Sequence, residues 1–274
     1  MIHEKKIVAM LDKRSQLGLI TEKIGQDFDL VTTKNDEQKY YITKIKPRYS
    51  KALKKGFAKD NFLEREEISS FAARIGAFIA LNGSGGLSAG GSQGLQVKDG
   101  KVYQIRNKGQ RFYETLAVYK NSRFGIIEGY KDVDPDLTGV KHTFHFGPWM
   151  IKDGVKRVDY PPIKDYDYII ARKHPRQGIG KRADGTIVII TVEGRRDDAP
   201  GLSIPEFADL FEQQGCVIAY NLDGGGSAQT WIDGRPLNIY ADGKERAVGD
   251  FIYFTSNSVN KRPYQAPVFR SDCQ

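Results

Sequence analysis

A carboxylate and a run of glycines occur together in residues 221–230, which read N-L-D-G-G-G-S-A-Q-T. Consecutive glycines lose much conformational entropy on folding, and their use is to let the backbone take positive φ and approach a ligand closely. Their unshielded amides can form a nest that binds an anion such as phosphate. The segment is not a nucleotide P-loop, because the Gly-Lys-Ser/Thr ending is missing. Asp223 is therefore the leading candidate for a nucleophile or an electrostatic stabiliser, with an Asx turn that caps the loop as the structural alternative.

A second glycine-rich loop, N-G-S-G-G, begins at Asn82 and Gly83. Both loops follow a short apolar run that is itself preceded by a helical pattern. Two such loops at predicted strand ends favour a ligand site over a tight turn without function. Asn82 and Asn221 would either bind a sugar or hold the loops in place, and the sequence does not separate these two roles.

Three further charged residues complete the candidate chemistry. Arg176 is the first candidate for binding phosphate, because a guanidinium fork can contact two phosphate oxygens, and a structural salt bridge is its alternative role. Arg246 is a weaker second candidate. Glu193 ends an apolar run and could orient water as a general base or bind sugar hydroxyls.

Three histidines raise the question of a zinc site. His142 and His145 lie in K-H-T-F-H-F, where strand alternation would place their rings on opposite faces, and no H-E-x-x-H motif or cysteine pair is present. We expect no metal and no required cofactor in catalysis, while a structural or active-site Ca²⁺ held by the many Asp-Gly loops stays open. His145 and His174 are instead candidates for lining the pocket.

The elements that must position these residues are short. Apolar spacing predicts a helix over residues 64–75 that ends at Gly76, and a second helix begins with a capping box at Ser203 and Glu206. Asp-Gly turns predict hairpins around residues 99–100, 153–154 and 184–185, and residues 231–236 predict another. Further strands are expected over residues 40–45, 77–81, 217–220 and 251–255. This pattern predicts a single α+β domain with a mixed β-sheet core flanked by helices, and with glycine-rich active-site loops at strand ends.

The composition excludes several classes of protein. The chain has 274 residues with 39% hydrophobic and 28% charged residues, which is ordinary for a globular protein. Its two cysteines, Cys216 and Cys273, cannot form a disulfide framework, and Cys216 is expected to be a small buried hydrophobe. No apolar run is long enough for a membrane span or a signal peptide, so the expected source is phage-borne or a shortened piece of a secreted protein, with the compartment left open. The oligomeric state is also left open.

Positive charge is concentrated near the N-terminus. Of the formal net charge of +8, residues 1–60 contribute +6, with 14 Lys/Arg against 8 Asp/Glu. The densest part, residues 44–59, includes Lys51, Lys54 and Lys55 and could steer an anionic polymer or a phosphorylated substrate, or could be an ordinary solvated face. No recognisable nucleic-acid-binding module accompanies it, so no nucleic-acid partner is expected.

The run N-L-D-G-G-G-S-A closely resembles the signature of the phosphodiester glycosidase family. Further stretches resemble the family in the same order: A-F-I-A-L-N-G at residues 77–83, F-G-P-W-M-I-K-D-G at 146–154, H-P-R-Q-G-I-G at 174–180 and V-E-G-R at 192–195. The resemblance implies a catalytic domain over residues 61–257, followed by a tail at 258–274. The basic segment at 1–60 is expected to supply strands that either pack on this domain or attach it. The chain departs from many members at residues 84–86, where an aromatic pair is common, and at Glu193, where Asp is frequent.

The resemblance implies hydrolysis of an α-linked N-acetylhexosamine 1-phosphate diester, within a glycan or cell-wall polymer such as teichoic acid as one possibility. That reaction develops positive charge on the sugar and negative charge on the departing phosphate, so it needs a cation and amides at the phosphate and a carboxylate near the anomeric carbon. The alternative is a non-catalytic module that binds phosphorylated glycan or cell-wall polymer. The expected catalytic residues are Asp223, Glu193 and Arg176, and the expected substrate-binding residues are Asn82, Gly83, His145, His174, Asn221, Gly224, Gly225, Gly226, Ser227 and Arg246.

Overall fold

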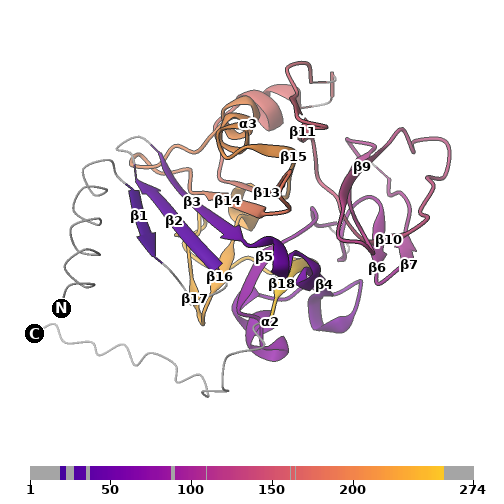
Figure 1. The fold of residues 1–274 in the computed structure, drawn as a ribbon, viewed down its shortest axis with the longest axis horizontal. Coiled ribbons are helices and arrows are strands. Elements are labelled where there is room, and N and C mark those ends of the chain that lie inside the picture. Colours follow the sequence, from indigo (N-terminus) through magenta and orange to yellow (C-terminus); the bar gives the residue numbers. More distant parts are fainter. Residues whose placement is uncertain are drawn as a thin grey trace, which may run out of the picture.

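The computed structural model describes residues 19–22, 28–34 and 38–255, with gaps at 88–89, 109, 161 and 164. The predicted tail at 258–274, with Cys273, lies outside the described residues. The described chain is mostly β-structure arranged in several antiparallel sheets, with few helices (Figure 1).

The largest sheet has eight strands. In spatial order they are β1 (Leu19–Glu22), β2 (Phe28–Lys34), β3 (Lys39–Ile45), β14 (Ile187–Val192), β13 (Arg176–Arg182), β15 (Cys216–Asn221), β11 (Trp149–Lys152) and β12 (Val155–Lys156). A second sheet has five strands: β17 (Arg235–Pro236), β16 (Thr230–Ile232), β5 (Ile79–Asn82), β18 (Asp250–Phe254) and β4 (Lys54–Phe57).

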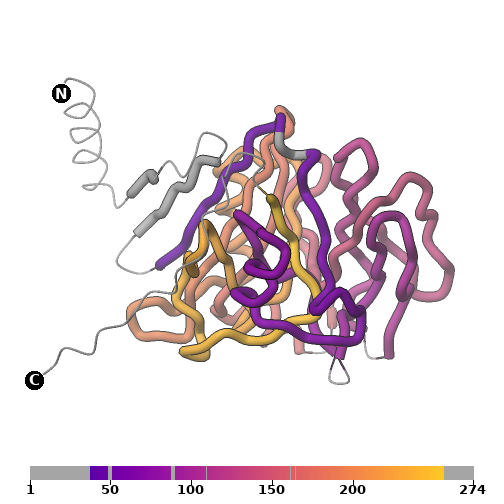
Figure 2. The backbone as a smooth tube through the Cα atoms, turned by 90° about the horizontal axis from the view of Figure 1, so that it is seen from below, coloured from indigo at the N-terminus to yellow at the C-terminus, as the bar shows by residue number. Residues whose placement is uncertain are grey.

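The remaining strands lie together at one side of the molecule (Figures 1 and 2). They are the three-stranded sheet β10 (Val140–Phe144), β8 (Glu114–Tyr119) and β9 (Phe124–Glu128), and the hairpin β6 (Gln96–Lys98) and β7 (Lys101–Gln104). The α-helices of the described chain are α2 (Ile68–Ile75) and α3 (Ile204–Gln213), and the shorter helical turns are η1 (Pro47–Ala52), η2 (Ala58–Asp60), η3 (Asp167–Ala171) and η4 (Gly225–Ser227).

The prediction of a mixed sheet is wrong for the described strands, because every strand pair among them is antiparallel. The physical reason lies in the connections. Short Asp-Gly turns can join only antiparallel neighbours. The helix α3 leads into β15, but β15 enters the sheet between β13 and β11, and it runs antiparallel to both.

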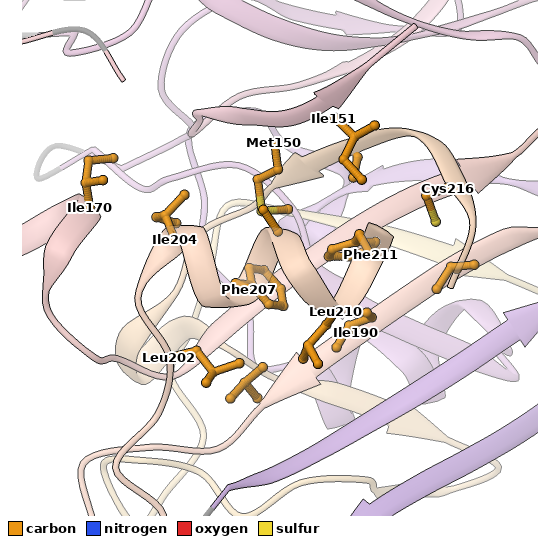
Figure 3. Packing of buried hydrophobic residues seen from close by; sticks show 14 of the residues in the cluster. Met150, Ile151, Ile170, Ile190, Leu202, Ile204, Phe207, Leu210, Phe211 and Cys216 are labelled. Atoms are coloured by element: carbon orange, nitrogen blue, oxygen red, sulfur yellow. The ribbon is translucent and has the colours of Figure 1, made fainter. Parts of the chain in front are cut away.

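The core lies in layers on both faces of the large sheet. In β14, Ile187 and Ile189 pack in the cluster shared with the second sheet, whereas Val188, Ile190 and Val192 pack in the cluster under α3. All six residues of β14 are buried, as expected for a strand covered on both faces. Figure 3 shows Phe207 and Phe211 of α3 within the second of these clusters.

Two glycines of β13 let α3 approach the sheet. A Cβ on Gly178 would lie 2.8 Å from the ring of Phe207, and one on Gly180 would lie 2.8 Å from the ring of Phe211. The predicted capping box of α3 is confirmed, because the Ser203 hydroxyl accepts from the Glu206 amide and the Glu206 carboxylate accepts from the Ser203 amide. The helix is thereby fixed at its start and pressed against β13 and β15.

The basic segment before residue 61 is built into both large sheets. β3 pairs with β14, and β4 pairs with β18. Lys55 of β4 is fully buried and forms an ion pair with Asp250 at 2.8 Å. The prediction that Lys55 belongs to an exposed steering surface is therefore wrong, because strand alternation turns its side chain into the protein.

Cys216 is buried with a free thiol, as expected. No helix of the described residues is long and apolar enough to cross a membrane.

Candidate active site

The two glycine-rich loops are in direct contact. The first follows β5 in the five-stranded sheet and the second follows β15 in the eight-stranded sheet. The Asn82 side-chain amide donates to the Asp223 carbonyl at 2.7 Å, and the Asp223 amide donates to the Gly83 carbonyl at 3.3 Å. The candidate site therefore lies where the ends of two sheets meet.

Asp223 stands at the entry to the Gly224–Gly226 turn. Burial raises the pKa of its carboxyl group to about 6, while a hydrogen bond with Ser227, the charge of Arg246 and the Gly224 amide oppose the rise. The carboxylate of Asp250 adds to it. A carboxyl group with this pKa changes its charge close to neutral pH, which suits acid–base or nucleophilic work.

The glycines of this turn have no side chains, and charged side chains from other segments lie against them. Gly225 has φ of 60°, a conformation that favours glycine. A Cβ on Gly225 would lie 2.8 Å from a guanidinium nitrogen of Arg195, and a Cβ on Gly226 would collide with Arg246 and Asp242. The backbone of the turn is therefore in direct contact with two arginines and one carboxylate.

Asp242 lies between the two arginines. Its carboxylate forms an ion pair with Arg246 and lies 3.8 Å from Arg195. The three side chains are 32–45% exposed, so they are accessible from solvent. The sequence places Arg195 in the motif V-E-G-R but indicates no role for it, and it gives no indication of Asp242. The signal for Arg195 was its place in that motif, whereas nothing in the local sequence marks Asp242.

Gln229 connects the first loop to Arg246. Its side chain donates to the Arg246 carbonyl at 2.9 Å and accepts from the Arg246 amide at 3.1 Å. The backbone amide of Gln229 donates to the Asn82 side-chain oxygen at 3.1 Å. Both ends of the Asn82 amide are thus bound to protein, which supports the loop-holding role over sugar binding.

Arg176 is buried, and its guanidinium contacts backbone carbonyls. It donates to Leu202 at 2.7 Å and to Arg172 at 2.8 Å, and it forms no ion pair with a carboxylate of the described residues. Burial lowers its pKa to about 10. Because Arg172 directly follows η3, the contact with its carbonyl connects Arg176 to the end of this turn. The structure therefore favours a role for Arg176 in holding η3 in place.

His174 also holds η3. Its Nε2 lies 3.0 Å from the carbonyl of Tyr168, and its ring centroid lies 4.5 Å from that of Tyr168. Burial lowers the pKa of His174, and neighbouring arginines lower it further, so the ring is neutral at pH 7. His174 is half-buried at the edge of the site.

Glu193 is enclosed by partners. One carboxylate oxygen accepts from the Tyr41 hydroxyl and from the Ile239 amide, and the other accepts from Arg196, each at 2.8 Å. The residue is 1% exposed. The predicted role as a base that orients water would require these contacts to open, so the structure favours a role in joining β3, β14 and the segment at Ile239.

His145 and Asn221 support the loops from behind. The His145 ring is enclosed by protein and contacts the hydroxyls of Thr115 at 2.8 Å and Tyr130 at 3.1 Å, and burial lowers its pKa to about 3. It therefore does not line an open pocket as expected, because the neighbouring sheet encloses it. Asn221 donates from its side chain to the Gly147 carbonyl at 2.7 Å.

Lys55 supports the first loop through Asp250. The Asp250 carboxylate accepts from the amide and the hydroxyl of Ser84, at 2.6 and 2.8 Å. A Cβ on Gly83 would lie 2.8 Å from the same carboxylate.

Among the described residues, no group of three or more His, Cys, Asp or Glu side chains is arranged to hold a metal ion.

Comparison with solved structures shows the same fold in other proteins. The catalytic domain of zebrafish N-acetylglucosamine-1-phosphodiester alpha-N-acetylglucosaminidase, auto-inhibited by its pro-peptide, superposes with a TM-score of 0.66 and 15% identity, covering 87% of this chain and 88% of that one. A hypothetical protein from Synechocystis has a TM-score of 0.62 and 14% identity, covering 86% and 63% of the two chains.

Sequence comparison finds two relatives. The SPbeta prophage-derived uncharacterized protein YomE of Bacillus subtilis (strain 168) is 36% identical over 231 residues, which cover 77% of this chain and 35% of that protein. N-acetylglucosamine-1-phosphodiester alpha-N-acetylglucosaminidase of Mus musculus is 24% identical over 197 residues, which cover 65% of this chain and 36% of that protein. The chain thus spans about a third of the length of either relative. The profile of the phosphodiester glycosidase family matches residues 71–255, and the chain belongs to this family.

Proposed function

We propose that this protein hydrolyses a sugar 1-phosphate diester at the Gly224–Gly226 turn. One observation carries the proposal: the carboxylate of Asp223 and the guanidinium groups of Arg195 and Arg246 converge on a turn with no side chain of its own. Cations and bare amides suit a phosphate, and the carboxylate suits the positive charge that develops on the sugar.

The phosphate takes the place that Asp242 now occupies. Asp242 contacts both arginines through one carboxylate, which is an anion with two oxygens in a plane. A phosphodiester offers the same pair of oxygens and can bind both guanidinium forks. Substrate binding therefore exchanges one anion for another, so that the arginines keep a partner in both states.

Asp223 acts at the anomeric carbon. The bond between this carbon and the phosphate oxygen breaks, and its electron pair leaves with the phosphate monoester. The water oxygen forms the new bond to the anomeric carbon, and its proton passes to a carboxylate or to solvent. Asp223 either attacks the carbon first, with retention, or activates the water directly, with inversion. The anomer released at first, observed by NMR, distinguishes the two.

The relatives suggest the substrate class. The name of the mouse enzyme points to an α-linked N-acetylglucosamine 1-phosphodiester. The prophage origin of the other relative supports a phage-borne protein, and we infer a glycan or cell-wall polymer as its target. No cofactor is needed for this reaction, because phosphate is already a good leaving group. The alternative function, binding of a phosphorylated glycan without turnover, uses the same arginines but not Asp223.

The deciding experiment uses α-N-acetylglucosamine 1-(methyl phosphate) as a small diester. We expect free N-acetylglucosamine and methyl phosphate, and we expect Asp223→Asn to lose at least ~100-fold in kcat while it still binds. Asp233→Asn, in the exposed turn between β16 and β17, is the matched control and should keep full activity. Binding of the diester without product release would support the non-catalytic alternative.

A further inference from the structure

The short turn η3 places an exposed aromatic ring at the edge of the proposed site. It is a single turn of π-helix, a form that occurs frequently at functional sites. Tyr168 in this turn is 48% exposed, whereas the next two residues, Ile169 and Ile170, are buried. We propose that Tyr168 is the wall against which the sugar ring of the substrate packs, an inference that rests on the function proposed above.

Two contacts locate the Tyr168 ring beside the glycine turn. A guanidinium nitrogen of Arg195 donates to the Tyr168 hydroxyl at 3.3 Å. The same nitrogen lies 2.8 Å from the position of a Cβ on Gly225. Tyr168 is therefore one side chain away from the amides that bind the phosphate, and a sugar attached to that phosphate comes within reach of the ring.

The structure holds η3 in place from below. Ile169 and Ile170 are 6% and 1% exposed and pack in the cluster under α3, where Figure 3 shows Ile170 near Ile204. The carbonyl of Tyr168 contacts His174, and the carbonyl of Arg172 accepts from Arg176. Two residues expected to bind substrate thus both act on this turn.

The cost of these contacts indicates that the position of η3 is important. Arg176 is 3% exposed, and its guanidinium is held by carbonyls without a carboxylate partner in the described chain. Burying such a cation is unfavourable, and a surface turn without a function does not require it. Arg176 and His174 are accordingly positioning residues for Tyr168.

The chemistry of Tyr168 fits a pyranose. One face of a pyranose ring carries C–H groups and is apolar, while its edge carries hydroxyls. A tyrosine offers a flat apolar face with a polar tip and loses little side-chain entropy on binding. Arg195 then contacts the phosphate and Tyr168 contacts the sugar. Together the two side chains select substrates in which the sugar is attached directly to the phosphate.

The test compares Tyr168→Ala, Tyr168→Phe and Tyr166→Ala. Tyr166 is the matched control, because it precedes the same turn, is 39% exposed and, in the described part of the chain, forms no hydrogen bond with Arg195. Turnover of α-N-acetylglucosamine 1-(methyl phosphate) gives kcat and KM. Calorimetry gives the Kd of α-N-acetylglucosamine 1-phosphate and of inorganic phosphate, and thermal melts report folding.

We expect Tyr168→Ala to raise KM and the Kd of the sugar phosphate by about 10-fold, the loss of one aromatic contact of ~1.4 kcal/mol. The Kd of inorganic phosphate, kcat and the melting temperature should change little, Tyr168→Phe should stay near wild type, and Tyr166→Ala should match wild type. An equal loss of inorganic phosphate binding would show that Tyr168 acts only through Arg195, and that would overturn the proposal. So would a Tyr168→Ala variant that behaves like Tyr166→Ala.

Failure of the proposed function is recognised separately. If the wild-type protein binds the sugar phosphate without turnover, the proposed hydrolase activity is wrong. The same comparison of Kd values then still decides the role of Tyr168. A wild-type protein that neither binds nor hydrolyses overturns both proposals.

Discussion

The side-chain amide of Asn82 donates to the backbone carbonyl of Asp223 at 2.7 Å, across 141 residues of sequence. This contact joins the ends of β5 and β15, which belong to different sheets. The position of the proposed catalytic carboxylate therefore depends on how the two sheets pack.

The first prediction concerns pH and activity. Burial raises the pKa of Asp223 to about 6, and the proposed reaction needs the ionised carboxylate. We expect kcat/KM to fall as the pH is lowered through about 6, approaching a tenfold loss per pH unit below it. A pH profile on the small diester measures this. A profile that stays flat down to pH 4 would mean that Asp223 does not act as a base or nucleophile.

The second prediction concerns pH and stability. The pKa of Asp223 is raised from 3.8, so the folded protein holds this proton more tightly than the unfolded chain. The resulting stability is fully present below pH about 4 and is lost as the pH rises through about 6. Asp223→Asn cannot ionise, so at pH 7 it should be more stable than wild type by about 3 kcal/mol. Denaturant unfolding of both proteins at acid and neutral pH tests the sign.

Local features of the fold could be predicted from sequence because their causes are local. The Asp-Gly turns after Lys98, Lys152 and Arg182, and the capping box at Ser203, each depend on a few neighbouring residues. The glycine turn at Asp223 was recognised for the same reason. The pairing of the sheets was not, because helix-to-strand order does not fix which strands become neighbours.

The residues whose surroundings could not be predicted are those whose partners are distant in sequence. Lys55 looks like part of a basic surface until β4 pairs with β18 and brings Asp250 to it. Glu193 looks like a free carboxylate until Tyr41 and Arg196 reach it. Asp242 carries no local signal, since its importance comes only from the two arginines beside it.

The third prediction concerns Asp242. If its carboxylate occupies the phosphate position, Asp242→Asn should free Arg195 and Arg246 and lower KM several-fold, with a smaller change in kcat. The effect should shrink as salt rises, because these side chains are partly exposed and screened within about 10 Å at 0.1 M salt. Asp132→Asn, on an exposed loop, is the control for lost negative charge. An unchanged or raised KM would show that Asp242 holds the arginines in place instead of competing with substrate.

The fourth prediction concerns Arg176. Arg176→Lys keeps the charge but loses the planar fork that contacts the carbonyls of Leu202 and Arg172 together. We expect impaired turnover of phosphodiesters, mainly through a higher KM, and faster amide exchange in η3. Exchange measured by mass spectrometry separates this role from direct phosphate binding, which would leave the exchange of η3 unchanged.

The fifth prediction concerns Lys55, which the structure removes from the steering surface. Replacing one partner of a buried ion pair leaves the other charge uncompensated, so Lys55→Met should lower the free energy of unfolding by about 3–5 kcal/mol. Lys51→Met, on the exposed face, should change it by no more than about 0.5 kcal/mol. Steering of a polymeric substrate by Lys51 and Lys54 stays a prediction, and it must be tested without Lys55. Equal stability of the two variants in denaturant would contradict the buried pair.

The central claim is that the Asp223 turn cleaves the bond between the anomeric carbon and the phosphate oxygen. Hydrolysis of α-N-acetylglucosamine 1-(methyl phosphate) in H₂¹⁸O, followed by mass spectrometry of both products, tests it most directly. We expect the label in the released N-acetylglucosamine and none in methyl phosphate, with Asp223→Asn releasing both products at least ~100-fold more slowly. Label in the phosphate product would mean attack at phosphorus, and it would contradict the role assigned here to Asp223.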